Sequence, residues 1–254
     1  MKESMNDHIF SKEYEVRYDD VDRNHELKAV SVLNYLEDTA LAHSAYLGYT
    51  LKRFLEEKNV WILTSLAMEM KRYPSYGESF TVETWAVDFG RFRATRNFRL
   101  KDSEGQLLGN LSSQWIFFDL TLRRPAKTTE EMKQDFGTNQ TCTLTTDSKK
   151  LSFDGMISYG DPMEIRHSDI DAMDHVNNKR YVEWMIEALP EDMQKQKVSR
   201  MEIAYLKEAH YGSSILSGFA PIENNEGEAG FFHKIMSLDG QTEHAFGKMY
   251  FDRF

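Results

Sequence analysis

A run of acidic, imidazole and amide side chains extends from Asp169 to Asn178, with the sequence Asp-Ile-Asp-Ala-Met-Asp-His-Val-Asn-Asn. A carboxylate and an imidazole can transfer protons or activate a water molecule. If a helix begins here, its free amide N–H groups can also receive an oxyanion. The same residues suit a structural role, because Asn and Asp are good helix N-caps and a neighbouring His can tie down a loop. Taken by itself, the run favours the structural role.

A helix is expected directly after this run. Apolar side chains recur there at i, i+3, i+4, i+7 and i+8, which places them on one helical face, and Pro190 stops the helix. These apolar residues are Tyr181, Trp184, Met185, Ala188 and Leu189. The predicted helix would hold the polar run at its N-terminus.

The polar run belongs to the second of two similar halves of the chain. The segment 15–22 is matched by the segment 164–171, and every matched pair is separated by 149 positions. Tyr76-Gly77 and Tyr211-Gly212 extend the match further along the chain. The segments 33–38 and 182–187 also match, as do the closing aromatic strands 115–119 and 249–252. Four similarities in the same order indicate an internal duplication. We therefore predict an N-terminal unit at 1–119, a linker at 120–159 and a C-terminal unit at 160–254.

Each unit is predicted to contain a short strand, one helix and then antiparallel hairpins, which makes an α+β layer. The first helix has a stripe of small and apolar residues that ends at Gly48: Leu33, Leu36, Ala40, Leu41, Ser44 and Leu47. The expected strands are 80–87, 92–100 and 107–118 in the first unit, and 215–220, 230–236 and 244–251 in the second. In the linker, Thr128 and Glu131 are spaced as a capping box for a short helix.

Asp-Ala-Met-x-His-Val-Asn-Asn, followed by Tyr181 and Trp184, resembles the signature of hotdog-fold thioesterases. Together with the duplication and the Arg123-Arg124-Pro125-Ala126 junction, it resembles the acyl-acyl carrier protein (acyl-ACP) thioesterases. The resemblance covers nearly the whole chain. It implies a double hotdog, with two helices each packed on an antiparallel β-sheet. It also implies catalysis in the C-terminal unit and acyl-chain accommodation mainly in the N-terminal unit.

The resemblance also implies a catalytic set. Asp171, His175 and Glu208 fall on the Asp, His and Glu positions of the family, and the family Glu lies on a later strand. At the family's Asn position this chain has Met173, whose side chain makes no useful hydrogen bond. Asp174 or Asn177 would take over the role of that Asn. Ala209 stands where plant relatives carry a cysteine, and Cys142 is in the linker, so thiolate catalysis is excluded.

Hydrolysis of a thioester needs an activated water or a carboxylate nucleophile and a polarised carbonyl. Amides of residues 176–178, including those of Asn177 and Asn178, are expected to polarise the carbonyl oxygen. Either Asp171 or Glu208 would activate water or attack directly, and the sequence leaves both open. His175 would orient the carboxylate or protonate the leaving thiolate.

The first unit repeats the sequence pattern around this site but lacks most of the catalytic residue types. Asp22 matches Asp171, whereas His25 meets Asp174 and Lys28 meets Asn177 at the same spacing. An insertion of one residue would instead align His25 with His175. We expect a degenerate site in the first unit, with a structural His25.

The implied substrate is a fatty acyl chain on acyl carrier protein, released as free fatty acid and holo-ACP. Lys179 and Arg180 are expected contacts for the carrier protein or its phosphopantetheine. An acyl-CoA thioesterase and a non-catalytic acyl-thioester-binding protein stay as alternatives. No cofactor and no metal are expected, since the chain has no phosphate-binding glycine loop and no metal-ligand spacing. The chain-length preference stays open.

Composition limits the remaining classes. The 254 residues carry a net charge of −10, which disfavours nucleic acid as a partner. No apolar run approaches the roughly 18 residues of a membrane span. A single cysteine favours a reducing cytoplasm. The first ten residues lack the features of a signal or transit peptide, so we expect the bacterial branch. Two fused units favour a monomer, with a homo-oligomer left open.

Overall fold

A computed structural model describes residues 3–141, 143–145, 151–171, 174–223 and 228–252. Contacts divide the chain into two compact units, residues 1–146 and 147–254. Met173 and Cys142, which the sequence singled out, lie outside the described residues. No helix in the described ranges is both long and apolar enough to cross a membrane.

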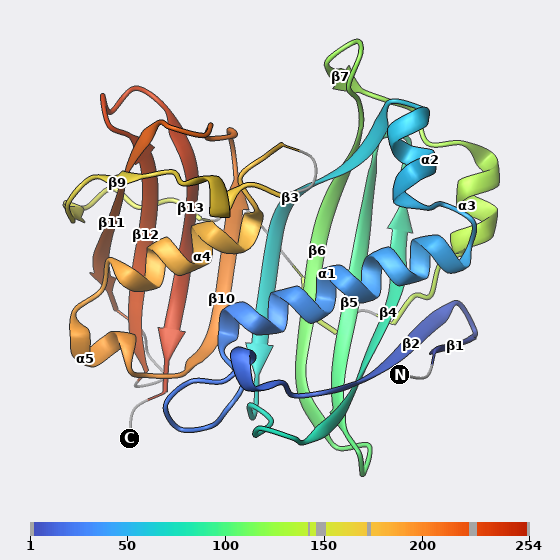
Figure 1. Cartoon of the computed structure of the whole chain (residues 1–254), viewed down its shortest axis with the longest axis horizontal. Helices are drawn as coiled ribbons and strands as arrows, with labels where there is room; N and C mark the ends of the chain where they lie inside the picture. The colour runs from blue at the N-terminus through green and yellow to red at the C-terminus, as the bar shows by residue number, and fades with distance from the viewer. Residues whose placement is uncertain (1–2, 142, 146–150, 172–173, 224–227, 253–254) are drawn as a thin grey trace. The chain divides into compact units, whose positions relative to one another are not determined.

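The sheet of the first unit is antiparallel, in the order β1–β2–β4–β5–β6–β3, with β7 paired to β6. Its strands are β1 (Glu3–Asn6), β2 (Ile9–Glu15), β3 (Asn59–Met70), β4 (Ser79–Phe89), β5 (Arg93–Asp102), β6 (Leu107–Asp119) and β7 (Arg124–Pro125). Its helices are α1 (Ala29–Tyr46), α2 (Leu51–Glu56) and α3 (Glu130–Phe136), after a 3-10 turn η1 (Tyr18–Asp20). Helix α1 packs on β2 and β4 and lies across one face of the sheet (Figure 1).

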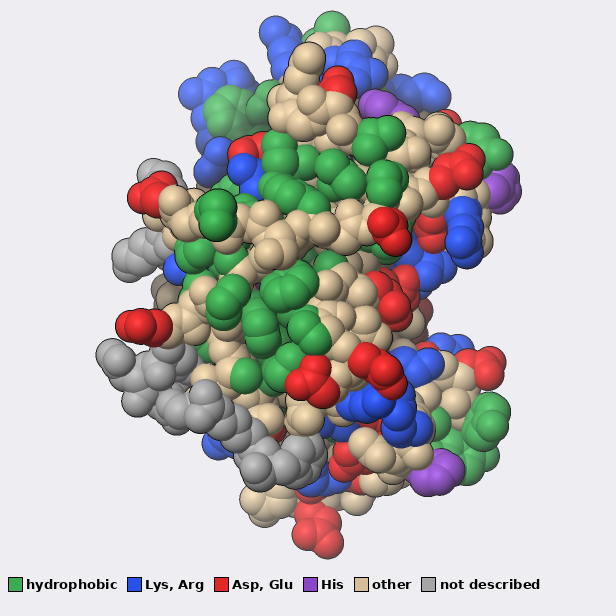
Figure 2. Space-filling model, turned by 90° about the vertical axis from the view of Figure 1, so that its left-hand side faces the viewer, with side chains coloured by type: hydrophobic (Ala, Val, Ile, Leu, Met, Phe, Trp, Pro, Cys, Tyr) green, Lys and Arg blue, Asp and Glu red, His purple; other side chains and the backbone are tan. Residues whose placement is uncertain are grey.

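The second unit repeats this arrangement with fewer strands, in the order β10–β13–β12–β11, with β8 and β9 on the edge strand β11. Its strands are β8 (Ser158–Tyr159), β9 (Met163–Glu164), β10 (Val198–Tyr205), β11 (Ser214–Ile222), β12 (Ala229–Ser237) and β13 (Glu243–Phe251). Its helices are α4 (Asn178–Glu187), α5 (Glu191–Gln194) and the 3-10 turn η3 (His167–Asp169). Helix α4 packs on β11 and β12. Figure 2 views the molecule from the side of β8, β9 and β11, where apolar side chains gather between charged ones.

The six predicted strands correspond to β4, β5, β6, β11, β12 and β13. The second helix buries Tyr181, Trp184 and Met185, as its periodicity predicted, and Leu189 is buried just after the helix ends at Glu187. The predicted face of the first helix is partly wrong, because Leu41 is 46% exposed. The face that packs on the sheet is more polar than predicted, since it includes the buried Thr39 and His43.

Buried polar groups on α1 are tolerated because distant strands supply their hydrogen bonds. The Tyr14 hydroxyl from β2 lies 2.8 Å from the Thr39 hydroxyl and donates to Asp38 Oδ2 at 2.9 Å. Lys12 Nζ pairs with the same carboxylate at 2.8 Å. These partners are more than 20 positions away in sequence, so helical periodicity alone does not reveal them.

The segment 120–141 is ordered against the first unit. Met132 and Phe136 of α3 are buried in a cluster with Tyr49, Phe54 and Phe117. The cap of α3 is one residue later than predicted: the Thr129 side chain accepts from Met132 N at 3.0 Å. Thr128 instead donates to Gly90 O at 2.8 Å.

Candidate active site

An imidazole and a carboxylate meet in the second unit. His175 Nε2 lies 2.9 Å from Glu208 Oε1, and the two side chains are 37% and 34% exposed. His175 precedes α4, whereas Glu208 follows β10 by three residues. The resemblance placed the glutamate on a strand, and that placement is wrong, because β10 ends at Tyr205. From this loop, the carboxylate reaches the imidazole that precedes the N-terminus of α4.

The backbone around His175 is held by Asp171. Asp171 N donates to His175 O at 2.8 Å, and His175 N donates to Asp171 Oδ1 at 3.2 Å. An isolated bridge between Ile170 and Val176 closes the loop on both sides. Asp174 has a positive φ of 63°, which turns the chain just before the imidazole. The loop therefore presents His175 in a defined orientation.

The Glu208 loop is anchored from two directions. Leu206 N and Lys207 N both donate to His244 O on β13, at 2.8 and 3.3 Å. Behind the carboxylate, the buried Ala209 N donates to the Tyr181 hydroxyl of α4 at 3.2 Å. Burial raises the pKa of Tyr181 to about 12, so the phenol stays neutral. Helix α4 thereby connects the two loops that carry His175 and Glu208.

The hydrogen bond that His175 Nε2 donates to the Glu208 carboxylate raises the pKa of His175, and burial offsets part of this effect. The negative charges of Glu208, Asp171 and Asp174 act in the same direction as the hydrogen bond. The pair therefore favours an imidazolium next to a carboxylate. Such a pair can hold a proton and deliver it to a leaving group, or accept one from water.

The N-terminus of α4 supplies the amides. Asn177 is its N-cap: its side chain accepts from Lys179 N at 3.1 Å. The amide of Asn177 is occupied, because it donates to Asp169 O at 2.9 Å. The Asn178 carbonyl oxygen accepts a hydrogen bond from the Tyr205 hydroxyl at 3.3 Å. Of the three predicted oxyanion amides, we therefore retain those of Val176 and Asn178, for which no acceptor is found within the described part of the chain.

The first unit has the same loop without the pair. Asp22 N donates to Glu26 O at 2.9 Å, and Glu26 N donates to Asp22 Oδ1 at 3.2 Å. His25 has φ 62°, which matches the 63° of Asp174. Glu26 therefore stands in the place of His175, and the one-residue insertion that would align His25 with His175 is wrong. At the position of Glu208, the first unit has the buried Tyr73.

The two cations expected to contact a carrier protein begin α4. Arg180 is engaged within the unit: its Nε lies 3.3 Å from Asp169 Oδ1, it pairs with Glu183, and it donates to Ser168 O at 3.1 Å. These contacts hold the 3-10 turn η3 to the helix. Lys179 is partly exposed.

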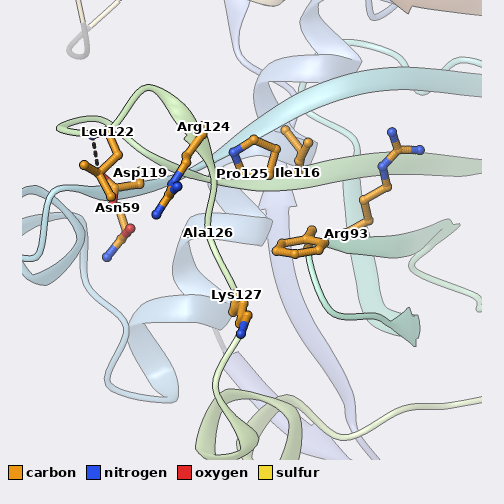
Figure 3. Close-up of a pocket in the computed structure, with 10 residues that line it drawn as sticks. Asn59, Arg93, Ile116, Asp119, Leu122, Arg124, Pro125, Ala126 and Lys127 are labelled. Atoms are coloured by element: carbon orange, nitrogen blue, oxygen red, sulfur yellow. Dashed lines mark hydrogen bonds between the residues drawn. The ribbon is translucent and has the colours of Figure 1, made fainter.

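A separate hollow of about 830 Å³ lies in the first unit, around β7 (Figure 3). Three cations contribute to its lining: Arg93, Arg124 and Lys127. Asp119 Oδ1 is engaged by the turn below them, where it accepts from Leu122 N at 2.8 Å. No sequence pattern singles out this hollow, because its residues come from three separate stretches of the chain: Asn59, 92–93 and 116–127.

Two sequence profiles match the chain. Residues 7–136 match the acyl-ACP thioesterase N-terminal domain, and residues 158–251 match the acyl-ACP thioesterase C-terminal domain. The chain belongs to the acyl-ACP thioesterase family. The His175–Glu208 pair lies within the part that matches the C-terminal domain.

Individual relatives agree with this membership. The chain is 28% identical over 223 residues to a chloroplastic palmitoyl-acyl carrier protein thioesterase of Arabidopsis thaliana, over 82% of this chain and 54% of that protein. It thus spans little more than half the length of that curated relative. An acyl-ACP thioesterase structure from Bacteroides thetaiotaomicron has a TM-score of 0.85 at 25% identity, over 96% of this chain and 98% of that one.

A plant structure gives the same fold. The 12:0-ACP thioesterase from Umbellularia californica has a TM-score of 0.81 at 20% identity, over 96% of this chain and 94% of that chain. The predicted fold class, an α+β double hotdog, is confirmed by these matches together with the two helix-on-sheet units.

Proposed function

We propose that the chain hydrolyses the thioester of fatty acyl-ACP to free fatty acid and holo-ACP, and thereby ends fatty acid elongation. The observation that carries the proposal is the 2.9 Å contact between His175 and Glu208, in the part of the chain that matches the family's C-terminal domain. The same proposal includes a cytoplasmic setting, which the single cysteine supports.

In the proposed reaction, water attacks the thioester carbonyl and gives its proton to Glu208, the member of the pair that is still a base when His175 is an imidazolium. The carbonyl oxygen becomes an oxyanion, which the amides of Val176 and Asn178 would stabilise. Removing one such donor in other enzymes costs roughly 10²–10³ in rate. Collapse of the tetrahedral intermediate breaks the carbon–sulfur bond, and His175 donates its proton to the departing thiolate.

The internal duplication helps to divide the roles of the two carboxylates. Asp22 makes the same backbone hydrogen bond as Asp171, although the described residues of the first unit contain no histidine–glutamate pair. The bond to the loop is therefore sufficient reason for an aspartate at this position. We assign Glu208 the chemical partnership with His175, and Asp171 the positioning of the imidazole and a supporting negative charge. Asp174 contributes charge from an exposed position.

The acyl chain is proposed to occupy mainly the first unit, whose own copy of the site is degenerate. For the carrier protein, Lys179 and Arg180 are the proposed contacts, and the guanidinium of Arg180 also binds Asp169, Glu183 and Ser168 O. A substitution of Arg180 would disturb η3 as well as a docking surface. Lys179→Glu is the cleaner probe.

The test is steady-state hydrolysis of a chain-length panel offered on ACP and on coenzyme A. Wild type, Asp171→Ala and Glu208→Ala run side by side, with folding checked by circular dichroism. We expect a preference for ACP, and a loss of activity in Glu208→Ala. Preference for coenzyme A would replace the substrate by acyl-CoA. Turnover of neither thioester would overturn the hydrolase and favour a non-catalytic acyl-binding protein.

A further inference from the structure

A partly buried arginine in the first unit reaches toward helix α1. Arg96 lies on β5 directly opposite Ser113 of β6, and Arg96 Nη1 reaches His43 Nδ1 of α1 at 3.0 Å. The same nitrogen donates to the buried Thr84 hydroxyl at 3.2 Å. The side chain lies over the Phe136 ring, with 5.7 Å from guanidinium carbon to ring centroid.

Among the described residues, this cation has no carboxylate partner. The described residues give Arg96 two neutral hydrogen-bond partners and one aromatic ring, and no ion pair. An ionised group is costly to bury unless it is paired. Burial lowers the pKa of Arg96 to about 10, which still leaves the guanidinium charged at neutral pH. Arg99, three residues later on the same strand, differs in this respect, because it forms an ion pair with Glu83 at 2.6 Å.

The neighbouring histidine supplies a buried donor that has no partner in the described structure. A guanidinium has donors only, so His43 Nδ1 must accept. Burial lowers the pKa of His43 to about 2, which makes the ring neutral and places its one proton on Nε2. His43 is fully buried, and Nε2 has no hydrogen-bond partner in the described structure. The Thr84 hydroxyl, which also accepts from Arg96, donates its own hydrogen bond to Asn97 O at 3.1 Å.

The surroundings are otherwise apolar. The Phe10 ring stacks on His43 with 5.2 Å between centroids, and Phe136 meets the imidazole edge-on at 5.3 Å. Donors without acceptors, next to aromatic rings, suit a ligand oxygen that is itself attached to a hydrocarbon.

We propose that Arg96 and His43 bind a carboxylate carried on an aliphatic chain, inside the first unit. The aliphatic part of this ligand rests on the proposed function, whereas the carboxylate follows from the two donors. Two sources supply the same chemistry: the free fatty acid product bound by its head group, or an acyl chain with a second carboxylate at its far end.

The first experiment is calorimetric titration of the full chain with fatty acids of 8 to 16 carbons and with the fatty alcohols of equal length. A bond to a charged group is worth about 10- to 100-fold in affinity. We expect wild type to bind the acid more tightly than the alcohol by about this factor. Equal affinity for acid and alcohol in wild type would overturn the proposal without any variant.

The variants locate the site. Arg96→Met should remove the preference for the acid and leave the alcohol unchanged, and His43→Phe should weaken it in part. Arg99→Met is the matched control on the opposite face of the same strand, and should change neither ligand. The thermal midpoint of Arg96→Met is expected to stay or rise, since a partly buried charge without an ion pair in the described structure is removed. A preference for the acid that survives Arg96→Met would overturn the assignment.

Kinetics separate the two sources. If the product binds here, Arg96→Met raises the inhibition constant of free fatty acid about 10- to 100-fold. If the far end of an acyl chain binds here, monothioesters of dicarboxylic acids have a higher kcat/KM than plain acyl thioesters, and Arg96→Met reverses this order. Calorimetry needs no turnover, so failure of this site and failure of the hydrolase proposal are distinguishable.

Discussion

Replacing Glu208 by Gln changes the chemistry of the site while keeping its size. The substitution removes the carboxylate charge 2.9 Å from His175 Nε2 and leaves a side chain of the same shape. The loop is held independently of this side chain, by Ala209 N on the Tyr181 hydroxyl and by two bonds to His244 O. Glu208→Gln should therefore separate catalysis from folding.

The structure fixes the expected size of both effects. Each side chain of the pair is more than one-third exposed, and ion pairs in contact with solvent contribute only about 0–1 kcal/mol to stability. A loss of that size lowers the thermal midpoint by no more than roughly 4 °C. Loss of acid–base catalysis, in contrast, lowers the rate about 10²–10⁴-fold, which corresponds to about 3–5 kcal/mol of activation free energy.

The assay is release of free thiol from acyl-ACP under saturating substrate, paired with thermal denaturation of the same preparations. Glu83→Gln is a matched control, since it removes another ion-paired glutamate, in the first unit. We expect its kcat to equal that of wild type. A Glu208→Gln enzyme with more than a tenth of wild-type kcat would refute the assignment of Glu208 to the chemistry.

Three further predictions follow from the same structure. By NMR titration, the pKa of His175 should lie above its ordinary value of about 6.5 and should fall in Glu208→Gln. The pair's contribution to the stability of the folded state is then complete below pH ~6.5 and is lost as pH rises through the raised pKa. An unchanged titration would contradict the pair. Tyr181→Phe leaves the buried Ala209 N without its acceptor, so unfolding free energy should fall by about 1–3 kcal/mol, measured in urea; no loss would show that this bond is unimportant. His233 is fully buried, and neither ring nitrogen has a hydrogen-bond partner among the described residues. Burial lowers its pKa to about 3, so it binds fewer protons in the folded than in the unfolded state, and its contribution to stability falls as pH drops from about 6.5 to 3. His233→Phe should flatten that decline and stabilise the protein by about 1–3 kcal/mol; a destabilised variant would mean that an unseen group satisfies the ring.

Local patterns predicted the parts of this protein that are held by local contacts. The spacing of 149 positions aligns the two loops residue by residue, down to the positive φ of His25 and Asp174. The apolar face of α4 and the six hairpin strands follow from periodicity and turn residues. The location of His175 at a helix N-terminus was also predictable from sequence.

Long-range hydrogen bonds explain what the sequence did not reveal. Helix α1 buries Thr39 and His43, because β2 and β5 supply partners for them, while Leu41 faces outward. A pattern of apolar residues misses a helix face of this kind. The contact between Glu208 and His175 joins residues 33 positions apart, and only the resemblance to the family pointed to it.

The most direct test of the account compares the same position in the two units. His175 and Glu26 occupy equivalent places in the two loops, and both donate a backbone N–H to the preceding aspartate. His175→Gln and Glu26→Gln would be assayed for kcat/KM on acyl-ACP, with folding verified for both. The account predicts at least a 100-fold loss in His175→Gln and wild-type activity in Glu26→Gln. An active His175→Gln, or a Glu26→Gln that loses activity while folded, would contradict the placement of the chemistry in the second unit.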